Sequence, residues 1–433
     1  MRPKAGKCLC RYKEMRKKII WINYLRLVFA AIIVGMLATL LADILKRMTE
    51  YFEEIIFGHA VRYPYLFLLL PSTGITLIYF LRKYLFKGRS NRGIKEIYQT
   101  LENRRDELPL YKIPSHFFNG FLTVVFGGST GIEVSTVVAG AAIGAGVYKK
   151  ETIANAFKAE LVCAGVAAGV ATLFANPLAG FLFAIEVISG RFTKTVALSA
   201  GVAAAISGIY LSLFTVHPFL DLQVTAWHGN ALPYFILLST LAAGIAVYFT
   251  RSVIFIKKKF YAIRSNFLRV NIGALLVGLS IYFLPQLFGD SYHSIPELLK
   301  NAEQQSFSSG TIILLLTLVL IKPLVTSLTL GAGGDGGVFA PSIVVGGILG
   351  MLVATVCNHY FNADLIILNF MLVGAAAALS AAIHAPLTAI VLACGIVPGG
   401  HILLIPLALG TFIAKYTANM ICGYTVYSYQ EKK

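Results

Sequence analysis

The sequence predicts an all-helical membrane protein built from two similar halves, and three observations support this fold class. Hydrophobic residues make up 57% of the 433 residues and charged residues only 13%, and the mean hydropathy is +0.75. A soluble domain carries roughly a quarter charged residues, so the composition indicates an integral membrane protein. The segment 131–144 recurs as 337–350, and the segment 165–187 recurs as 374–396. Repeats of this kind are typical of membrane proteins with a central site between their halves.

The first repeated segment keeps its glycines in register. Aligned without a gap, the copies pair Gly131 with Gly337, Gly140 with Gly346, and Gly144 with Gly350. The copies differ where the first has Glu133 and the second has Phe339. A carboxylate at membrane depth is a candidate functional group, so Glu133 is the first candidate site residue.

Apolar runs recur along the chain from residue 19 to the end. They include 65–81, 156–190, 195–215, 267–286, 311–330, 337–357 and 365–397. A membrane-spanning helix needs about 20 residues, and Gly or Pro interrupts many of these runs, so we expect half-length helices beside full spans. The predicted organisation is a basic segment 1–18 followed by one membrane domain, 19–433, with halves of about 19–250 and 265–433.

The net charge of +17 comes from basic segments beside apolar runs. Lys and Arg gather in 2–18, 82–112 and 251–269, as the positive-inside rule expects of cytoplasmic segments. We therefore expect lipid headgroups rather than nucleic acid as partners, and both termini in the cytoplasm. The apolar run after the basic start is long enough to stay as a helix, and no signal-peptide cleavage pattern follows it.

Cysteine and histidine do not predict a metal site, and no cofactor is expected. Four cysteines lie in apolar runs, where they behave as small hydrophobic residues: Cys163, Cys357, Cys394 and Cys422. Cys8 and Cys10 are isolated, whereas a zinc site needs about four ligands. An intramembrane enzyme using Glu133 and Asp335 would need a His, Ser or metal in register with them, so we do not expect an enzyme.

Two glycine-rich breaks predict an anion site. The segments 127–131 and 331–337 each precede an apolar helix, and non-helical backbone inside a membrane must be buried in protein or line a cavity. The helix that starts there presents unpaired N–H groups and a positive dipole end, which favour an anion. Close helix packing through glycine is the alternative interpretation.

Glu133 lies at such a helix start. Its carboxylate is stabilised by the same N–H groups that could hold an anion, so it could occupy the site and leave on protonation. Glu133 is therefore a candidate gate. The alternative interpretation is that Glu133 only complements the dipole of its own helix.

With these features the chain resembles the CLC family of chloride channels and anion/proton antiporters. Gly131-Ile132-Glu133-Val134-Ser135 resembles the family's G-K/R-E-G-P segment and places Glu133 at the gating glutamate. Residues 334–341 resemble G-x-F-x-P, which implies that backbone N–H groups of Val338 and Phe339 bind the anion, with Ile132 as a further contact. Residues 423–428 place Tyr427 at the tyrosine whose hydroxyl binds the central chloride.

The chain also departs from the family pattern. Residues 91–97 are the counterpart of G-S-G-I-P, with Arg92 in the place of the anion-coordinating serine, and Ser90 could substitute after a small shift. Both are kept as candidate anion contacts. Antiporters of the family have a second glutamate at the position of Val187. Glu186 beside it matches a structural acid of the family and is also kept as a candidate proton carrier.

The resemblance implies an all-α fold of two inverted-topology repeats of full and half-length helices, without a cytoplasmic regulatory domain. It also implies a homodimer with one pore per subunit, in a prokaryotic inner membrane. Because Val187 is not ionisable, we expect a passive chloride channel, gated by voltage or pH through Glu133. The alternative is a secondary antiporter that exchanges chloride or fluoride for protons.

Overall fold

The computed structural model describes residues 4–89, 91–102, 108–150, 157–214, 222–304 and 309–429. These residues form sixteen α-helices with short 3-10 and π turns. Within the described ranges the one β contact is an isolated antiparallel bridge between Gly131 and Gly337. The predicted all-α fold class is confirmed.

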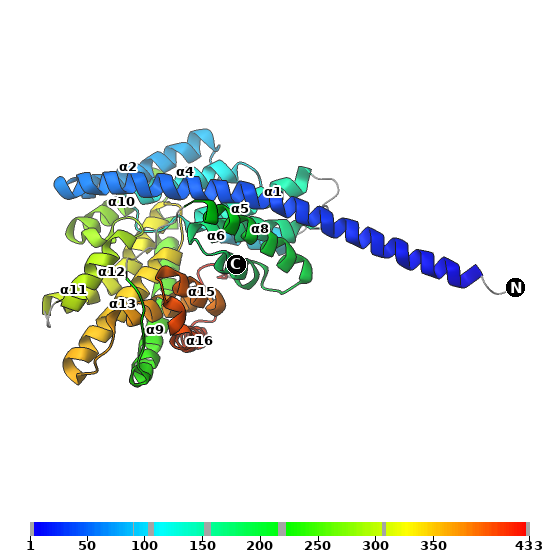
Figure 1. Ribbon diagram of the computed structural model, residues 1–433. Coiled ribbons are helices and arrows are strands. Elements are labelled where there is room, and N and C mark those ends of the chain that lie inside the picture. The colour runs from blue at the N-terminus through cyan, green and yellow to red at the C-terminus, as the bar shows by residue number, and fades with distance from the viewer. Residues whose placement is uncertain are drawn as a thin grey trace.

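Eight helices make up the first half. They are α1 (Lys4–Arg62), α2 (Leu66–Phe80), α3 (Ile94–Glu102), α4 (Lys112–Val125), α5 (Glu133–Lys150), α6 (Lys158–Leu173), α7 (Pro177–Phe183) and α8 (Lys194–Leu213). Helix α1 is continuous, so the boundary predicted at residue 18 lies inside it, and its N-terminal part extends beyond the other helices (Figure 1).

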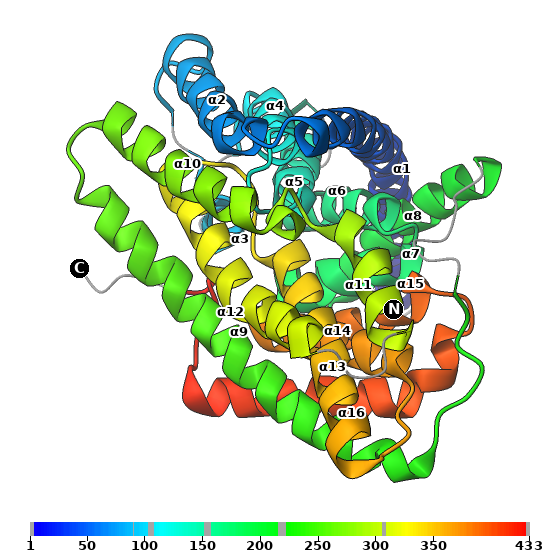
Figure 2. The same ribbon diagram turned by 90° about the vertical axis from the view of Figure 1, so that its left-hand side faces the viewer.

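Eight further helices make up the second half. They are α9 (Leu232–Tyr261), α10 (Asn266–Phe283), α11 (Ile295–Gln304), α12 (Ser309–Ala332), α13 (Phe339–Phe361), α14 (Ile367–Ile383), α15 (Pro386–Ile396) and α16 (Leu404–Ile421). The two halves lie on opposite sides of the molecule, and α2 and α10 run side by side where they meet (Figure 2).

The packing repeats between the halves. Helix α1 packs on α4, α6 and α8, and α9 packs on α12, α14 and α16. Helix α5 packs on α6 as α13 packs on α14. Each of these helices of the first half therefore has a counterpart in the second half, the eighth helix after it in the chain. The halves meet between α8 and α9, whereas the predicted boundary at residue 250 falls inside α9. The basic run 251–269 marks the end of α9 and not the end of a half.

Eight helices of the described chain are long and apolar enough to cross a membrane. Shorter apolar helices lie between them, at Glu133–Tyr148, Pro177–Ser189, Ile367–Ile383 and Pro386–Ile396. Of the apolar window of α13, 89% is buried inside the protein. This helix is therefore surrounded by other helices and not by lipid.

Glycines bring two helix pairs into backbone contact. A Cβ atom on Gly140 would lie 2.5 Å from the carbonyl oxygen of Gly165. In the second half, a Cβ atom on either Gly346 or Gly374 would lie 2.3 Å from the carbonyl oxygen of the other. Small residues allow such close approach of helices in bilayers. These glycines allow the helices to pack closely. The glycines of the two breaks instead lie just before the starts of α5 and α13.

Candidate functional site

The two glycine-rich breaks meet at the centre of the molecule. Gly131 and Gly337 form the antiparallel bridge. The Thr130 hydroxyl accepts a hydrogen bond from the Gly337 N–H at 2.9 Å and donates one to the Gly337 carbonyl at 3.0 Å. Helices α5 and α13 begin two residues after these glycines, at Glu133 and Phe339. The structure therefore brings two helix N-termini, one from each half, to one place.

Tyr427 comes to the same place from the segment after α16. Its hydroxyl accepts a hydrogen bond from the Val338 N–H at 3.3 Å. Tyr427, Val338 and Phe339 are 7%, 1% and 2% exposed. These three predicted anion contacts lie together at the start of α13, where the N–H groups and the hydroxyl could donate to one anion.

The Glu133 side chain turns back over the break. A Cβ atom on Gly131 would lie 2.1 Å from Glu133 Oε2, and the next nearest atom is Cβ of Ala340. The carboxylate faces its own backbone N–H and the N–H of Ala340 in the first turn of α13. Glu133 is only 5% exposed. Its carboxylate therefore lies at the N-terminus of α13, where an anion is favoured.

The Ile132 side chain does not face this centre. It is 9% exposed and packs with Leu45, Val124 and Leu173. An alkyl side chain cannot donate a hydrogen bond, so any contact of Ile132 with an anion would come from its backbone amide.

The two remaining candidate anion contacts are Ser90 and Arg92. Ser90 lies outside the described residues. The Arg92 side chain is exposed, and its backbone N–H donates to Glu96 Oε1 at 2.6 Å. The exposed side chain is not among the buried groups around Tyr427, so the prediction that Arg92 coordinates the central anion is not supported. An exposed cation instead suits a vestibule.

Glu186 joins the two halves. It lies in a π turn, Ala184–Ser189. Its carboxylate accepts hydrogen bonds from the backbone N–H of Leu387 at 3.2 Å and of Thr388 at 2.8 Å, and from the Thr388 hydroxyl at 2.8 Å. Glu186 thus caps α15 from the other half of the chain, which is a structural role.

The neighbouring Val187 provides no titratable group. Its side chain is 8% exposed, and its carbonyl accepts a hydrogen bond from the Tyr98 hydroxyl at 3.0 Å. Burial raises the pKa of Tyr98 to about 12, so this hydroxyl stays neutral.

Glu186→Ala is expected to lower the free energy of unfolding by about 1.5–3 kcal/mol, the usual contribution of a hydrogen bond to a charged group. The variant removes the cap of α15 and leaves its first N–H groups unsatisfied. Thermal unfolding in detergent measures the loss. Glu54→Ala, at an exposed position of α1, is the matched control. Equal unfolding curves for Glu186→Ala and the parent would contradict the capping role.

A buried cluster of charged residues, which the sequence did not predict, lies next to Glu133. Lys322 in α12 is 1% exposed, and its Nζ donates to the Gly289 carbonyl at 3.2 Å and to the Ser291 hydroxyl. Its charge interacts with Glu53 and Asp290. Burial raises the pKa of Asp290 to about 6, against the opposing effects of the Tyr292 N–H and Lys322. The Tyr292 hydroxyl lies beside the Glu133 carboxyl group.

Part of this cluster has donor atoms at metal-ligand spacing. One ligand atom each from Glu53, Asp290 and His293 lies within 4.8 Å of the others. The Lys322 ammonium interacts with both carboxylates, so its positive charge balances one of their two negative charges and disfavours a cation beside it. We assign no metal there.

A second buried network surrounds Asp335, on the side of the basic segments. Asp335 is 5% exposed. Its Oδ2 lies 3.1 Å from Nδ1 of His116, 2.8 Å from Nδ2 of Asn91 and 3.8 Å from a guanidinium nitrogen of Arg82. Its backbone N–H donates to the Thr123 hydroxyl at 2.9 Å. The network connects α4 with the break before α13.

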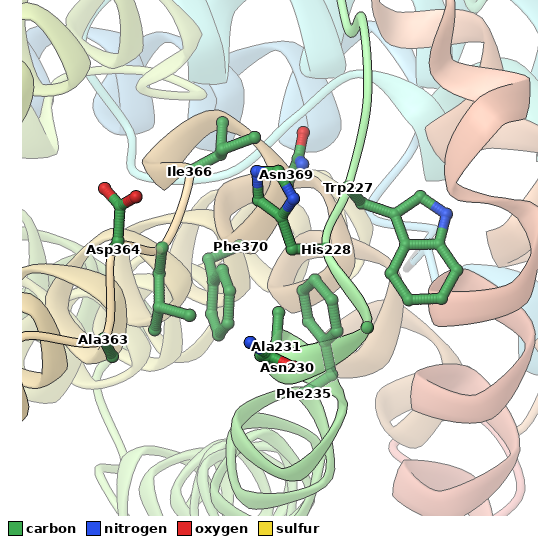
Figure 3. A pocket seen from close by; sticks show the side chains of 12 residues that line it. Trp227, His228, Asn230, Ala231, Phe235, Ala363, Asp364, Ile366, Asn369 and Phe370 are labelled. Carbon is green, nitrogen blue, oxygen red and sulfur yellow. The ribbon is translucent and has the colours of Figure 1, made fainter.

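A separate hollow lies away from these residues. It is a pocket of about 410 Å³ that opens between the connection before α9 and the turn between α13 and α14 (Figure 3). Trp227, His228 and Asp364 line it, and the rings of Phe235 and Phe370 stack at 4.3 Å. None of the candidate anion or proton residues lines this pocket, so it is not the site.

Comparison with known proteins identifies similar sequences over most of the chain. The profile of the family described as "Voltage gated chloride channel" matches residues 73–419. The "H(+)/Cl(-) exchange transporter ClcA" of Vibrio vulnificus is 26% identical over 435 residues, which cover 92% of this chain and 88% of that protein. The protein of the same name from Yersinia pestis is 27% identical over 361 residues, 81% of this chain and 74% of that protein.

Solved structures share the fold. A slow cyanobacterial Cl⁻/H⁺ antiporter has a TM-score of 0.77 at 24% identity, covering 93% of this chain and 96% of that chain. A CLC-type fluoride/proton antiporter has a TM-score of 0.76 at 22% identity, covering 93% and 97%. The arrangement of full and half-length helices is therefore that of these transporters.

Proposed function

Because the chain belongs to the voltage-gated chloride channel family, a family of membrane anion transport proteins, we propose that it exchanges chloride for protons. The curated relatives named above are exchange transporters, which favours the alternative of the sequence prediction over a passive channel. The channel prediction depended on Val187, which cannot ionise, and on a structural role for Glu186. Chloride is the proposed anion because those relatives are named for chloride exchange.

The position of the Glu133 carboxylate is the observation that carries this proposal. As a carboxylate it faces the N–H of Ala340 at the start of α13, where a chloride ion would be favoured for the same electrostatic reason. Protonation removes the charge and with it this attraction. The Glu133 carboxylate and an anion therefore compete for the helix starts, so binding of the anion there is linked to protonation of Glu133, which is the basis of exchange.

The proposal includes a homodimer with one pore in each subunit, with both termini in the cytoplasm. The orientation rests on the positive-inside rule: basic residues follow α2 and end α9. The side of Glu53 and Asp290 is then the outer side, and the side of His116 and Lys112 is the inner side.

Liposomes that contain the purified protein test the exchange directly. Chloride and proton fluxes are recorded together under an imposed chloride gradient, with the voltage clamped near zero by a potassium ionophore. We expect the chloride gradient to drive protons uphill at a fixed ratio of ions. Chloride flux without proton movement would leave the passive channel as the function.

Tyr427→Phe is expected to weaken chloride binding by about tenfold or more, because a hydrogen bond to a charged partner contributes about 1.5–3 kcal/mol. The variant removes only the hydroxyl that faces the Val338 N–H. Calorimetric titration of the detergent-solubilised protein with chloride measures the change. Tyr424→Phe, at a position of the same segment that is 38% exposed, is the control. Equal affinity in Tyr427→Phe and the parent would remove Tyr427 from the site.

A further inference from the structure

Exchange requires a group that passes protons between Glu133 and the inner solution. An unpaired charge in the low-dielectric interior is costly, so the proton needs an ionisable or hydrogen-bonding path. Val187 cannot ionise, and the Glu186 carboxylate is occupied by the start of α15. The inner proton acceptor must therefore lie elsewhere if the proposed function is correct.

His116 is a buried titratable group on the inner side. It has no part in the anion contacts or in the gating role of Glu133 described above. It lies in α4 and is 0% exposed. Its Nδ1 lies 3.1 Å from Oδ2 of Asp335, an ion-pair contact without the geometry of a hydrogen bond, and this carboxylate favours a proton on Nδ1. Its Nε2 has no hydrogen-bond partner among the described residues. A neutral histidine held in this way presents a lone pair on Nε2 that can accept a proton.

Buried polar side chains continue from His116 along α4 towards Glu133. Asn119 and Thr123 follow at one and two further turns and are 0% and 1% exposed. Ser135 of α5 packs against this helix, because a Cβ atom on Gly120 would lie 2.5 Å from its hydroxyl oxygen. Polar residues thus lie between the ring of His116 and the gate.

Several atoms of this row have no hydrogen-bond partner in the described part of the chain. They are both ring nitrogens of His116, Oδ1 of Asn119, Oγ of Ser135 and Oε2 of Glu133. Buried polar atoms that lack a protein partner are typically satisfied by internal water. The row is therefore suited to carry a proton along side chains and water.

A chain of hydrogen bonds also runs from Asp335, which faces His116, to the inner surface. Asn91 donates to Asp335 at 2.8 Å and accepts from Lys112 Nζ at 3.1 Å. Lys112 Nζ lies 2.8 Å from Glu96, whose side chain is 14% exposed. The path thus reaches Glu96, a partly exposed group of α3.

We propose that His116, positioned by Asp335, is the inner proton acceptor of this transporter. The Glu133 carboxyl group releases its proton into the row of polar groups, and Nε2 of His116 gains one, so Glu133 becomes a carboxylate and His116 an imidazolium. Release of one ring proton to the inner solution, past Asp335, restores the neutral ring. The reverse sequence loads Glu133 from inside.

Charged groups lie around His116 on several elements. Asp335 is the negative partner on the break before α13. Arg82 follows α2 and lies 3.8 Å from Asp335, and Lys257 of α9 interacts with both Asp335 and Lys95. Lys112 of α4 pairs with Glu96 of α3. Asp335 is thus the charged group in direct contact with the His116 ring. Its negative charge stabilises the protonated form of that ring.

The coupled flux assay in liposomes tests the role of His116. In His116→Gln we expect the ratio of proton flux to chloride flux to fall by at least about tenfold, because general acid–base groups contribute factors of this size or more. His401→Gln is the matched control, since His401 is exposed in a turn that packs on α15 and α16. Gel filtration of each variant in detergent reports whether it has folded.

Asp335→Asn provides a second test that does not depend on His116→Gln folding. A neutral partner no longer stabilises the imidazolium, so the pH at which proton flux is half-maximal should fall by about 1 unit or more. An unchanged pH profile, or an unchanged flux ratio in folded His116→Gln, would overturn the inference while exchange itself stands. Loss of coupling in Glu186→Gln alone would assign the role to Glu186. A parent protein that moves no protons would overturn both the inference and the proposed exchange.

Discussion

Glu133→Gln is expected to abolish proton-coupled transport and to make chloride flux independent of pH. In the parent, the carboxylate faces the N–H of Ala340 at high pH and opposes chloride there, and protonation at low pH relieves this competition. The amide has no charge at any pH, so chloride flux should no longer rise as the pH falls. Proton flux driven by a chloride gradient should fall by at least about a hundredfold, the size expected for loss of an acid–base group.

The measurement is chloride efflux and proton uptake from liposomes over a range of pH, with folding checked by gel filtration. Glu297→Gln, at an exposed position of α11, is the control and should behave as the parent does. Retained pH dependence in folded Glu133→Gln would mean that Glu133 only complements the dipole of α5. Retained proton uptake would exclude it from the proton path.

Gly374→Val is expected to prevent the native packing of α13 on α14 and to destabilise the protein by more than about 3 kcal/mol, at the upper end of overpacking effects. A Cβ atom on Gly374 would lie 2.3 Å from the carbonyl oxygen of Gly346 and 3.1 Å from the backbone nitrogen of Gly350. Both neighbours are backbone atoms, so no side-chain rotation relieves the overlap. Helix α13 carries Phe339 at its start, so the site would be lost together with the packing.

Thermal unfolding and the yield of monodisperse protein measure this effect. Gly244→Val is the matched control, because Gly244 is an exposed residue of α9 and a Cβ atom added to it would have no neighbour within 4 Å. Valine has a higher helix propensity than glycine, so this control should fold at least as well as the parent. Equal stability of the two variants would show that α13 can move away from α14 without loss.

Features with a local signal could be predicted from the sequence. A glycine-rich segment before an apolar run marks a helix start, and the structure begins α5 at Glu133 and α13 at Phe339 as expected. The internal repeat predicted two similar halves, because the same segments carry the same packing glycines. Tyr427 came from the resemblance of its segment, and the structure places it beside Val338.

Features that depend on contacts between the halves could not be predicted. Lys322 is a single cation in an apolar run, and only the fold brings it to Glu53 and Asp290. The pairing of His116 with Asp335 likewise joins α4 to the break before α13. Glu186 was considered for protons because of its neighbour, but its partners lie in α15. The predicted boundary at residue 250 lies inside α9, and the basic run that ends α9 does not mark the end of a half.

The paired hydrogen bonds between Thr130 and Gly337 limit how this molecule can move. They tie the start of α5 to the start of α13 at the point where the two halves meet, so a rocking motion of one half against the other would have to break them in every cycle. Collective motions of whole domains take microseconds to milliseconds. A movement of the Glu133 carboxyl group alone leaves both hydrogen bonds intact, so access to the anion site can change while the two helix starts stay joined.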